Sequence, residues 1–410
     1  MANLMLVFSG ILFGSLLLFL LFVFSVFIVG LFRREPEVSF SAPVSVVIPA
    51  YNEEANIKRC IRSVLASDYP AGFEVIVVDD DSSDRTVEIA RELARRDRRV
   101  SVVQERHGGK SAALNAGIRR ARNEFVFTLD ADTIVEKDCI AELMRPFADS
   151  KVAAASANCR VLNSAGVLGW FQNIEYHYNN LISSSFSRVF GQSMWFFGAA
   201  ACYRKPVLEK IGFFKREMLA EDMNVSLEVI KAGFKSVNVR KAVGWTSVPE
   251  SVPELFRQRY VWCIGGLQAV LRNFRLLGRS VPVFFLGFTQ FWGTLYSLLA
   301  IPVIAYLVFY WLPYNSGSLF SVLLYLFRWF SIVGTFFVIY KIPEWGIAYY
   351  TLFGILSGIV SMVMIVSALR MFNDRMWLRN AAAVFFYFPY TILLNLIIVA
   401  SIVRHVARVK

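Results

Sequence analysis

The chain has 410 residues, of which 56% are hydrophobic and 18% charged, with a formal net charge of +12. A soluble domain usually carries about 25% charged residues, so this composition excludes an ordinary soluble protein and predicts that part of the chain lies in lipid. Much of the positive charge lies beside apolar segments, at Arg272, Arg275, Arg279 and residues 404–410, where basic residues flank membrane helices. It is not interleaved with aromatic stacking residues, which argues against nucleic acid as a partner.

The five cysteines are scattered, odd in number and never in a CxxC pair. This spacing argues against both a disulfide framework and a structural zinc site, and it fits a reducing compartment.

The first element in chain order is residues 5–32, which contain no charged side chain and precede Arg33 and Arg34. A bilayer-spanning helix needs about 20 apolar residues, so we expect an N-terminal transmembrane anchor within residues 1–36. A cleaved signal peptide is the alternative. The apolar run is about twice the usual length for a signal peptide, no basic residue precedes it and no small-residue cleavage pattern follows.

Residues 43–250 have ordinary composition and predict one α/β domain. We expect strands at 44–49, 73–79, 100–103 and 125–130, with helices at 57–66, 85–95 and 110–121 between them. This alternation implies βαβ units and a mostly parallel sheet, in which ligands bind beyond the carboxyl ends of the strands. Further along, we expect helices at 138–147 and 224–232 and a strand at 152–160.

Residues 251–280 predict an interfacial amphipathic helix, and residues 281–410 a C-terminal membrane region. Its four candidate segments are 281–312, 320–340, 347–369 and 381–403. With residues 5–32 these make five expected spans. Five spans place the arginine-rich loop 370–379 on the side opposite residues 404–410, against the positive-inside tendency. One segment is therefore expected to be re-entrant or interfacial, and the two candidates are those containing Arg328 and Pro389.

Acidic residues follow two of the predicted strands. Asp130 and Asp132 leave a strand through a turn, where two carboxylates can converge on Mg²⁺ or Mn²⁺; a solvated acidic turn is the alternative. Asp79 and Asp80 end another strand and could accept hydrogen bonds from a nucleotide base or ribose. Asp84 is expected to cap the next helix.

Three further motifs carry candidate chemistry. In the sequence HGGKSAALN (107–115), Lys110 opens a helix, where a bound anion would satisfy both the lysine and the free backbone N–H groups; the spacing does not match a Walker motif. Glu221 and Asp222 either cap the following helix or supply a general base for an acceptor hydroxyl. Trp262, in QRYVW (258–262), is by default an interfacial anchor.

Taken together, VVIPAYNEE (46–54), VVDDDSSDRT (77–86), HGGKSAALNAG (107–117), LDAD (129–132), AED (220–222) and QRYVW resemble glycosyltransferase family 2. Within that family the motifs resemble the membrane-bound cellulose- and hyaluronan-synthase-like branch. The resemblance implies an inverting enzyme with a GT-A catalytic domain, a Rossmann-like and mostly parallel sheet, fused to an α-helical transmembrane domain. The donor is then a UDP- or GDP-sugar, and the cofactor Mn²⁺ or Mg²⁺.

The resemblance also implies roles for individual residues. Asp222 is the catalytic base, with Glu221 beside it, and Asp132 holds the metal together with Asp130. The remaining residues bind the donor (Pro49, Tyr51, Glu53, Asp79, Asp80, Lys110 and Asp130) or border the acceptor and close the site (Phe197, Gly198, Gln258, Arg259 and Trp262).

Two departures from the family pattern bear on the product. Val261 stands where the family motif Q-x-x-R-W has arginine, and Arg257 or Arg259 could take its place at the donor diphosphate. The membrane part is also small for a polymer-extruding enzyme. We therefore expect a multi-pass cell membrane protein with a cytosolic catalytic domain, surrounded by membrane lipids, that glycosylates a lipid-linked acceptor. That acceptor is polyprenyl or dolichyl phosphate, or a glycan built on it.

One point favours a glycan, since a bare phosphate is already an anion and needs no base such as Asp222. The alternatives are a processive polysaccharide synthase, a membrane transporter with a nucleotide-binding domain, and a non-catalytic sugar-nucleotide binder.

Overall fold

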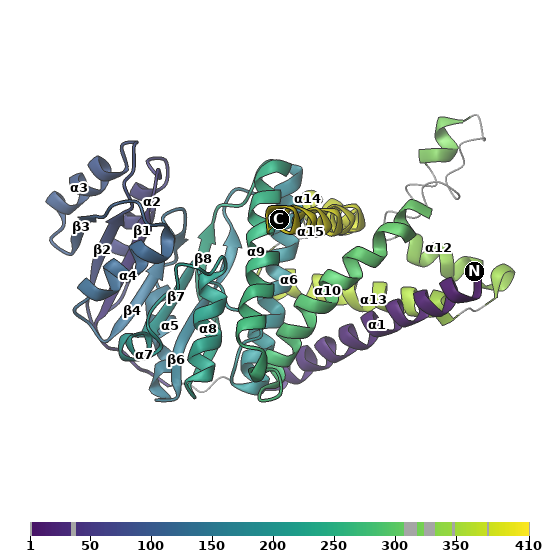
Figure 1. Cartoon of the computed structure of the whole chain (residues 1–410), viewed down its shortest axis with the longest axis horizontal. Coiled ribbons are helices and arrows are strands. Elements are labelled where there is room, and N and C mark those ends of the chain that lie inside the picture. Colours follow the sequence, from purple (N-terminus) through teal and green to yellow (C-terminus); the bar gives the residue numbers. More distant parts are fainter. Residues whose placement is uncertain are drawn as a thin grey trace.

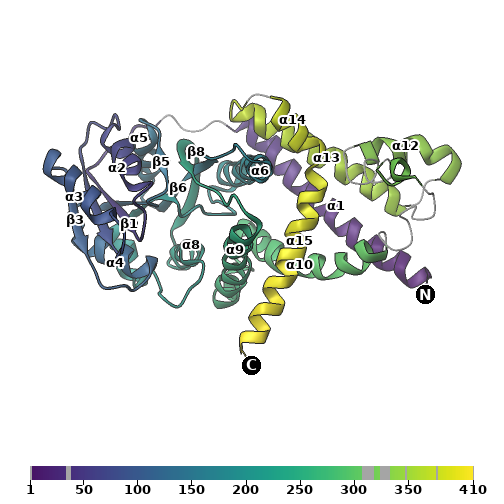
Figure 2. The same cartoon turned by 90° about the horizontal axis from the view of Figure 1, so that it is seen from above.

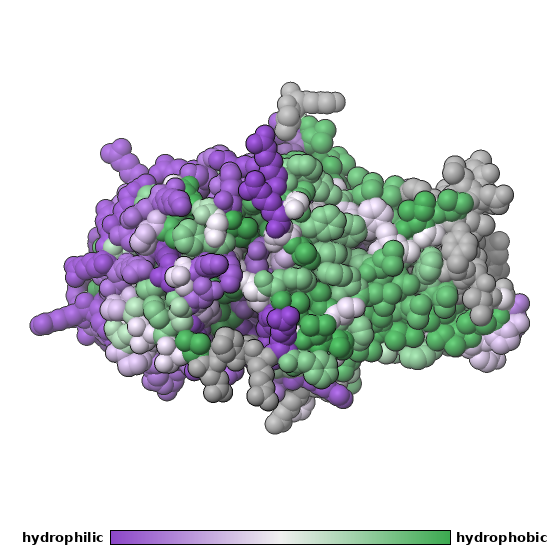
Figure 3. Space-filling model, turned by 90° about the horizontal axis from the view of Figure 1, so that it is seen from below, coloured by the Kyte–Doolittle hydropathy of each residue, from purple (hydrophilic) through white to green (hydrophobic). Residues whose placement is uncertain are grey.

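The computed structural model describes residues 2–33, 38–306, 318–323, 333–346, 349–374 and 377–409. These residues form an α/β domain at one end of the molecule and a group of long helices at the other (Figure 1). The surface follows the same division, because hydrophilic residues cover the α/β domain and hydrophobic residues cover the helical end (Figure 3).

The described residues of the α/β domain build an eight-stranded sheet in the order β3-β2-β1-β4-β7-β6-β8-β5. Strands β3, β2, β1 and β4 run parallel, whereas β7 is antiparallel to both β4 and β6. Strand β8 runs parallel to β6 and antiparallel to β5. The strand bounds are Val44–Ala50 (β1), Phe73–Asp79 (β2), Val100–Gln104 (β3), Phe125–Leu129 (β4), Ile134–Val135 (β5), Val152–Val161 (β6), Ala200–Arg204 (β7) and Lys235–Thr246 (β8). The prediction of a mostly parallel sheet is confirmed.

Helices α2 (Ile57–Leu65), α3 (Thr86–Arg96) and α4 (Lys110–Arg120) connect the first four strands. Helix α4 lies close on the sheet at Gly117, where an added Cβ would collide with Val47 and Val78. Strand β1 pairs with β2 on one side and β4 on the other, so the order of the strands reverses there. In such sheets a crevice for ligands opens at the carboxyl ends of the strands beside this point.

Past β4 the structure differs more from the sequence-based expectations. Strands β7 and β8, helix α6 (Val167–Phe190) and helix α7 (Lys205–Ile211) were not expected. The expected helix at 138–147 is shorter, because α5 (Cys139–Met144) gives way to a 3-10 turn at Pro146, which lacks an N–H for the helix. Helix α8 (Glu221–Lys231) begins earlier than expected, and its two leading acidic residues suit the positive end of the helix dipole.

The helical end contains α1 (Ala2–Phe32), α10 (Val281–Tyr306), α12 (Val333–Trp345), α13 (Tyr349–Met371), α14 (Leu378–Phe385) and α15 (Tyr387–Val409). Four of the described helices are long and apolar enough to cross a membrane, over Gly10–Phe32, Val281–Pro302, Leu352–Met371 and Pro389–Arg408. Of the five expected spans, 320–340, the end of 281–312 and the first two residues of 347–369 lie partly outside the described residues. The described part of 320–340 includes the start of helix α12, which is described over 13 residues.

Helix α9 (Val252–Arg272) joins the two parts, and the Ser251 hydroxyl caps it by accepting from the Glu254 N–H at 3.4 Å. Helices α1, α10 and α13 extend away from the domain, whereas α15 crosses them and packs against both α9 and α10 (Figures 1 and 2). Pro389 lies in the first turn of α15, where a missing N–H breaks no helical hydrogen bond.

Candidate active site

The turn after β4 carries the two carboxylates expected to bind a metal. The Asp130 carbonyl accepts from the Thr133 N–H at 2.9 Å, and Asp132 Oδ1 accepts from the hydroxyls of Thr133 at 3.1 Å and Thr246 at 3.4 Å. Burial, followed by the nearby charge of Asp130, raises the pKa of Asp132 to about 7. The charge of Asp130 therefore disfavours ionisation of Asp132 in the absence of a cation.

These carboxylates fit a divalent cation in their donor chemistry, because Mg²⁺ and Mn²⁺ prefer oxygen ligands. Within the described ranges no group of three or more His, Cys, Asp or Glu side chains is placed to hold a metal. A cation on Asp130 and Asp132 would therefore take its other ligands from water and from diphosphate oxygens, as Mg²⁺ often does.

Lys110 begins α4 directly after Gly109, whose φ of +81° suits glycine. Its Nζ lies 2.7 Å from Asp130 Oδ1 and 3.2 Å from Glu221 Oε1. Burial opposes the lysine charge, but these carboxylates outweigh it and raise the pKa of Lys110 well above its usual value. The anion that the sequence led us to expect at Lys110 is thus supplied here by the protein's own side chains.

Asp80 shapes the loop that places Lys110. Its carboxylate accepts from the N–H of Gly108 at 2.8 Å and of Gly109 at 3.0 Å, and His107 Nδ1 lies 3.0 Å from Oδ2. Both oxygens are therefore engaged within the protein. Asp79 differs, because its Oδ2 accepts from the Ser82 N–H at 3.2 Å while its buried Oδ1 has no partner among the described residues. Of the two residues, only Asp79 therefore keeps a carboxylate oxygen without a hydrogen bond in the described part of the chain.

The residues after β1 form a neighbouring rim. Pro49 pairs with β2 near the end of β1, and Tyr51 is half exposed, with its ring centroid 4.7 Å from that of His107. Glu53 Oε2 accepts from Asn56 Nδ2 at 2.9 Å, and burial raises the pKa of the Glu53 carboxyl.

Asp222 lies in the first turn of α8 and faces the loop before β7. Its Oδ2 accepts from the Gly198 N–H at 2.9 Å, and its Oδ1 from the Met223 N–H at 2.7 Å. Gly198 has no room for a side chain, since an added Cβ would collide with the Asp222 carboxylate. Burial, followed by the charge of Glu221, raises the pKa of Asp222 to about 6. At neutral pH the Asp222 side chain is thus mostly a carboxylate, and it binds a proton more tightly than the carboxylate of an exposed aspartate does.

Helix α9 contributes Gln258, Arg259 and Trp262. Arg259 is buried and forms a bidentate ion pair with Glu175 of α6, at 2.7 and 2.9 Å, and its guanidinium lies 4.1 Å from the centroid of the Trp262 ring. The Tyr390 hydroxyl also donates to Glu175, at 2.6 Å. Arg259 is therefore not a free cation for a diphosphate, contrary to the substitution considered from the sequence. Arg257 is exposed on α9.

One cavity of about 760 Å³ joins many of these residues. It runs from Lys110, Asp130 and Asp132 past Asp222 to the membrane-region helices α10 and α15. Among the expected residues its lining includes Glu221, Phe197, Gly198, Gln258, Arg259 and Trp262, whereas Pro49, Tyr51, Glu53, Asp79 and Asp80 lie outside it. The structure thus divides the expected site into a cavity and a separate region at the ends of β1 and β2.

The cavity also contains residues that sequence reasoning missed. They are Glu175, Tyr176, Trp195 and Thr246 on the domain side, and Thr289, Gln290, Thr294, Leu394 and Ile398 on the membrane side. One signal could have found Glu175, because it is the only acidic residue in the 24 residues of α6. The others stand in no recognisable local pattern.

Comparisons with known proteins agree with this architecture. Residues 45–212 match the family model described as Glycosyl transferase family 2. The chain is 30% identical over 268 residues to the poly-beta-1,6-N-acetyl-D-glucosamine synthase of Staphylococcus epidermidis, over 65% of each chain. It is 30% identical over 250 residues to the synthase of the same description from Staphylococcus aureus strain COL, over 60% of each chain. The chain therefore spans 65% or less of the length of these curated relatives.

Among solved structures, a mannosyltransferase from Pyrobaculum calidifontis, in complex with GDP-Man and Mn²⁺, aligns with a TM-score of 0.62 at 21% identity. The alignment covers 88% of this chain and 99% of the mannosyltransferase. At this identity the likeness shows the fold. The protein accordingly has a GT-A fold joined to apolar helices, and its residues 45–212 match glycosyltransferase family 2. The fold predicted from the sequence is confirmed, and the match over residues 45–212 agrees with the predicted family resemblance.

Proposed function

We propose that this protein transfers a sugar from a nucleotide-sugar to a hydroxyl group of a glycan, with inversion at the anomeric carbon. The observation that carries the proposal is the position of Asp222. Its carboxylate lies in a cavity that reaches from Lys110 and the Asp130–Asp132 turn at one end to membrane-region helices at the other.

The donor would bind at the carboxyl edge of β1, β2 and β4. The unpartnered Oδ1 of Asp79 suits a hydrogen bond from the nucleotide base, and Tyr51 offers an exposed ring directly after Ala50, which pairs with Asp79 across β1 and β2. Asp130 and Asp132 would hold a divalent cation, which neutralises the charge that develops on the leaving diphosphate. Lys110 Nζ lies 2.7 Å from Asp130 Oδ1, so Lys110 would add a second positive charge there.

Asp222 would act as the base toward the acceptor. It accepts the proton of the acceptor hydroxyl as that oxygen bonds to the anomeric carbon, and the bond from this carbon to the diphosphate breaks on the opposite face. A single displacement of this kind inverts the configuration. With a pKa of about 6, Asp222 is mostly ionised at neutral pH and remains basic enough to take the proton.

The walls of the cavity favour a sugar acceptor. Tyr176, Trp195, Phe197 and Trp262 line it and offer aromatic faces to sugar rings. A base is also needed for a hydroxyl but not for a phosphate. Together with the similarity to poly-beta-1,6-N-acetyl-D-glucosamine synthases, this supports extension of an N-acetylglucosamine polysaccharide from UDP-N-acetylglucosamine as the first candidate reaction.

A second candidate is a lipid-linked glycan acceptor. The cavity reaches Leu394 and Ile398, which lie within the apolar segment of α15. An acceptor anchored by a lipid could therefore enter from the membrane side and receive one or a few sugars.

We further propose that the protein is a multi-pass membrane protein with its GT-A domain in the cytosol. Basic residues gather at the domain side of the helical end: Arg272 lies in the last turn of α9 and Arg370 in the last turn of α13. Arg404 joins them, because its guanidinium lies 5.4 Å from the centroid of the Tyr260 ring of α9. Since α15 crosses the other long helices (Figure 2), we propose that it lies in the interface, which places these arginines on one side as the positive-inside tendency favours.

Sugar transfer by the purified protein in nanodiscs tests the proposal. Labelled UDP-N-acetylglucosamine, UDP-glucose and GDP-mannose would be offered with Mn²⁺ or with EDTA, and the products separated by solvent extraction and by size. Label in a large, water-soluble product supports the polysaccharide, and label in the organic phase only when polyprenyl-linked glycan is added supports the lipid-linked acceptor. If no sugar is transferred from any of the three donors to water, glycan or lipid, the proposal is overturned.

A further inference from the structure

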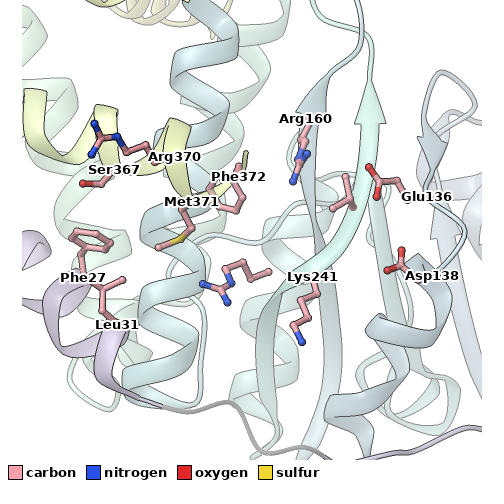
Figure 4. Close-up of a pocket in the computed structure, with 12 residues that line it drawn as sticks. Phe27, Leu31, Glu136, Asp138, Arg160, Lys241, Ser367, Arg370, Met371 and Phe372 are labelled. Carbon is pink, nitrogen blue, oxygen red and sulfur yellow. The ribbon is translucent and has the colours of Figure 1, made fainter. Parts of the chain in front are cut away.

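A second hollow, of about 700 Å³, lies between the sheet and the helical end (Figure 4). One wall comes from Phe27 and Leu31 of α1 and from the last turn of α13 with Phe372 after it. The opposite wall comes from the sheet and the segment after β5. The polar residues that line the hollow are Glu136, Asp138, Arg160, Arg240, Lys241, Ser367 and Arg370.

This hollow and the proposed active site lie on opposite faces of the same two strands. On β6, Cys159 lines the first cavity and Arg160 the second; on β8, Thr246 lines the first and Val243 the second. Successive side chains of a strand point to opposite faces of its sheet. The hollow is therefore a separate site that the proposed sugar transfer does not use.

The cations that line the hollow outnumber its carboxylates. Arg160, Arg240, Lys241 and Arg370 line it against two acidic residues, and in the part of the chain that the structure describes no hydrogen bond or ion pair engages any of these four side chains. Lys110 and Arg259, by contrast, are both paired with carboxylates. Four unpaired cations around one hollow repel each other, and a bound anion would relieve that repulsion.

Arg160 shows the need for an anion most clearly. Its guanidinium lies 5.3 Å from the centroid of the Trp245 ring and 5.8 Å from that of the Phe372 ring, and its buried Nε has no acceptor among the residues that the structure describes. A buried donor without a partner costs free energy, which an anionic oxygen in the hollow would recover.

The hollow also lies at the ends of two candidate membrane spans. The apolar segments of α1 and α13 end at Phe32 and Met371, and the hollow is bounded by the last turns of both helices. Its helical wall is apolar at Phe27, Leu31 and Met371, while Arg160 and Lys241 stand on the sheet side (Figure 4). Apolar and cationic surfaces thus meet in one site.

We infer that this hollow binds an anionic phospholipid, with the phosphate on Arg160, Arg240 and Lys241 and the start of an acyl chain against Phe27 and Leu31. The carboxylates of Glu136 and Asp138 would accept from headgroup hydroxyls, which makes phosphatidylglycerol the best-matched headgroup. The bound lipid would hold the β6–β8 side of the GT-A domain against α1 and α13.

Native mass spectrometry of the detergent-purified full chain, titrated with phosphatidylglycerol, tests the inference without any activity assay. The variant Arg240→Gln/Lys241→Gln removes two cations of the hollow. The control Arg95→Gln/Arg98→Gln removes two exposed arginines around α3 and β3, at the end of the α/β domain far from the long helices (Figure 1). A basic residue near anionic lipid contributes a factor of about 5 in affinity, so we expect about 30-fold weaker binding by the first variant and wild-type binding by the second.

Three further measurements complete the test. Arg160→Gln should weaken binding as well, and its melting temperature shows whether this variant folds. If it does not fold, the Arg240→Gln/Lys241→Gln variant, which changes side chains nearer the surface, provides the test. Phosphatidylcholine should bind weakly to the wild type. Equal phosphatidylglycerol binding by both double variants would overturn the inference, and glycerol 3-phosphate binding as tightly as the lipid would reassign the site to a soluble phosphate.

Discussion

Replacing Asp222 with Asn removes the proposed base while keeping its shape. The amide oxygen of Asn can still accept from the Gly198 N–H, which lies 2.9 Å from Oδ2 in the structure, but its NH2 group cannot accept from the Met223 N–H as Oδ1 does. A general base contributes about 10² to 10⁴ in rate, so we expect kcat to fall by that factor. The KM for the donor should change by less than about threefold, because the lost interaction belongs to the transition state.

The same substitution should stabilise the folded protein at neutral pH. Burial raises the pKa of Asp222 from 3.8 to about 6, so the folded state binds this proton more tightly than the unfolded state. Ionisation therefore lowers the stability of the wild type as pH rises through this range, and the loss is complete above pH 6. At roughly 1.4 kcal/mol per pH unit, the loss is about 3 kcal/mol. Asn does not ionise, so the variant avoids this loss at pH 7.5 and has no advantage at pH 4.

Initial rates against donor concentration and thermal unfolding in EDTA, at pH 4 and 7.5, measure both effects. The control is Glu221→Gln, which removes one ion-pair partner of Lys110 but leaves the base, and it should cost less than about tenfold in kcat. Wild-type activity should fall as pH drops through 6. If the Asp222→Asn variant keeps more than about a tenth of the wild-type kcat, Asp222 is not the base.

Three further predictions follow from the site. Gly198→Ala forces a Cβ against the Asp222 carboxylate and should lower kcat about 10²-fold. The control Gly278→Ala, which has open space around its Cβ, should keep the wild-type kcat. An equal kcat for the two variants would refute the close contact between Gly198 and Asp222. Glu175→Gln leaves Arg259 buried without its ion-pair partner and should lower the free energy of unfolding by about 3 kcal/mol. The double variant Glu175→Leu/Arg259→Met should restore most of that loss. Calorimetry measures both variants, and a Glu175→Gln variant as stable as the wild type would contradict the importance of the pair. EDTA should abolish sugar transfer by the wild type, and added Mn²⁺ should restore it. The Asp132→Asn variant should stay inactive with added Mn²⁺. A wild-type activity that is insensitive to EDTA would exclude a role for the metal in transfer.

The first half of the sheet was predictable because its pattern is local. Strands β1, β2 and β4 are buried on both faces and read as runs of Val, Ile and Phe. Since parallel strands share one carboxyl edge, Asp79 and Asp130 could be placed at that edge from the sequence.

The second half depends on contacts between distant residues. Strand β8 carries Lys235, Arg240 and Lys241 among its apolar residues, so its alternation is irregular, and β7 is held between β4 and β6 by pairing that no local pattern specifies. Helix α6 buries many polar side chains, which hides the apolar face that usually identifies a helix.

The candidate site was predicted where motifs mark it and missed where tertiary packing makes it. Lys110, Asp130 and Asp222 stand in short motifs, and the structure brings them to one cavity. Glu175 meets Arg259 from 84 residues away, so sequence reasoning could not anticipate that this arginine is already paired.

A structure of the protein in nanodiscs with Mn²⁺ and a non-transferable UDP-N-acetylglucosamine analogue tests the central claim most directly. The account predicts the diphosphate beside Asp130, Asp132 and Lys110, with the sugar in the cavity and the anomeric carbon directed toward the side of Asp222. A nucleotide bound elsewhere, or a sugar separated from Asp222 by the wall of the cavity, would contradict it.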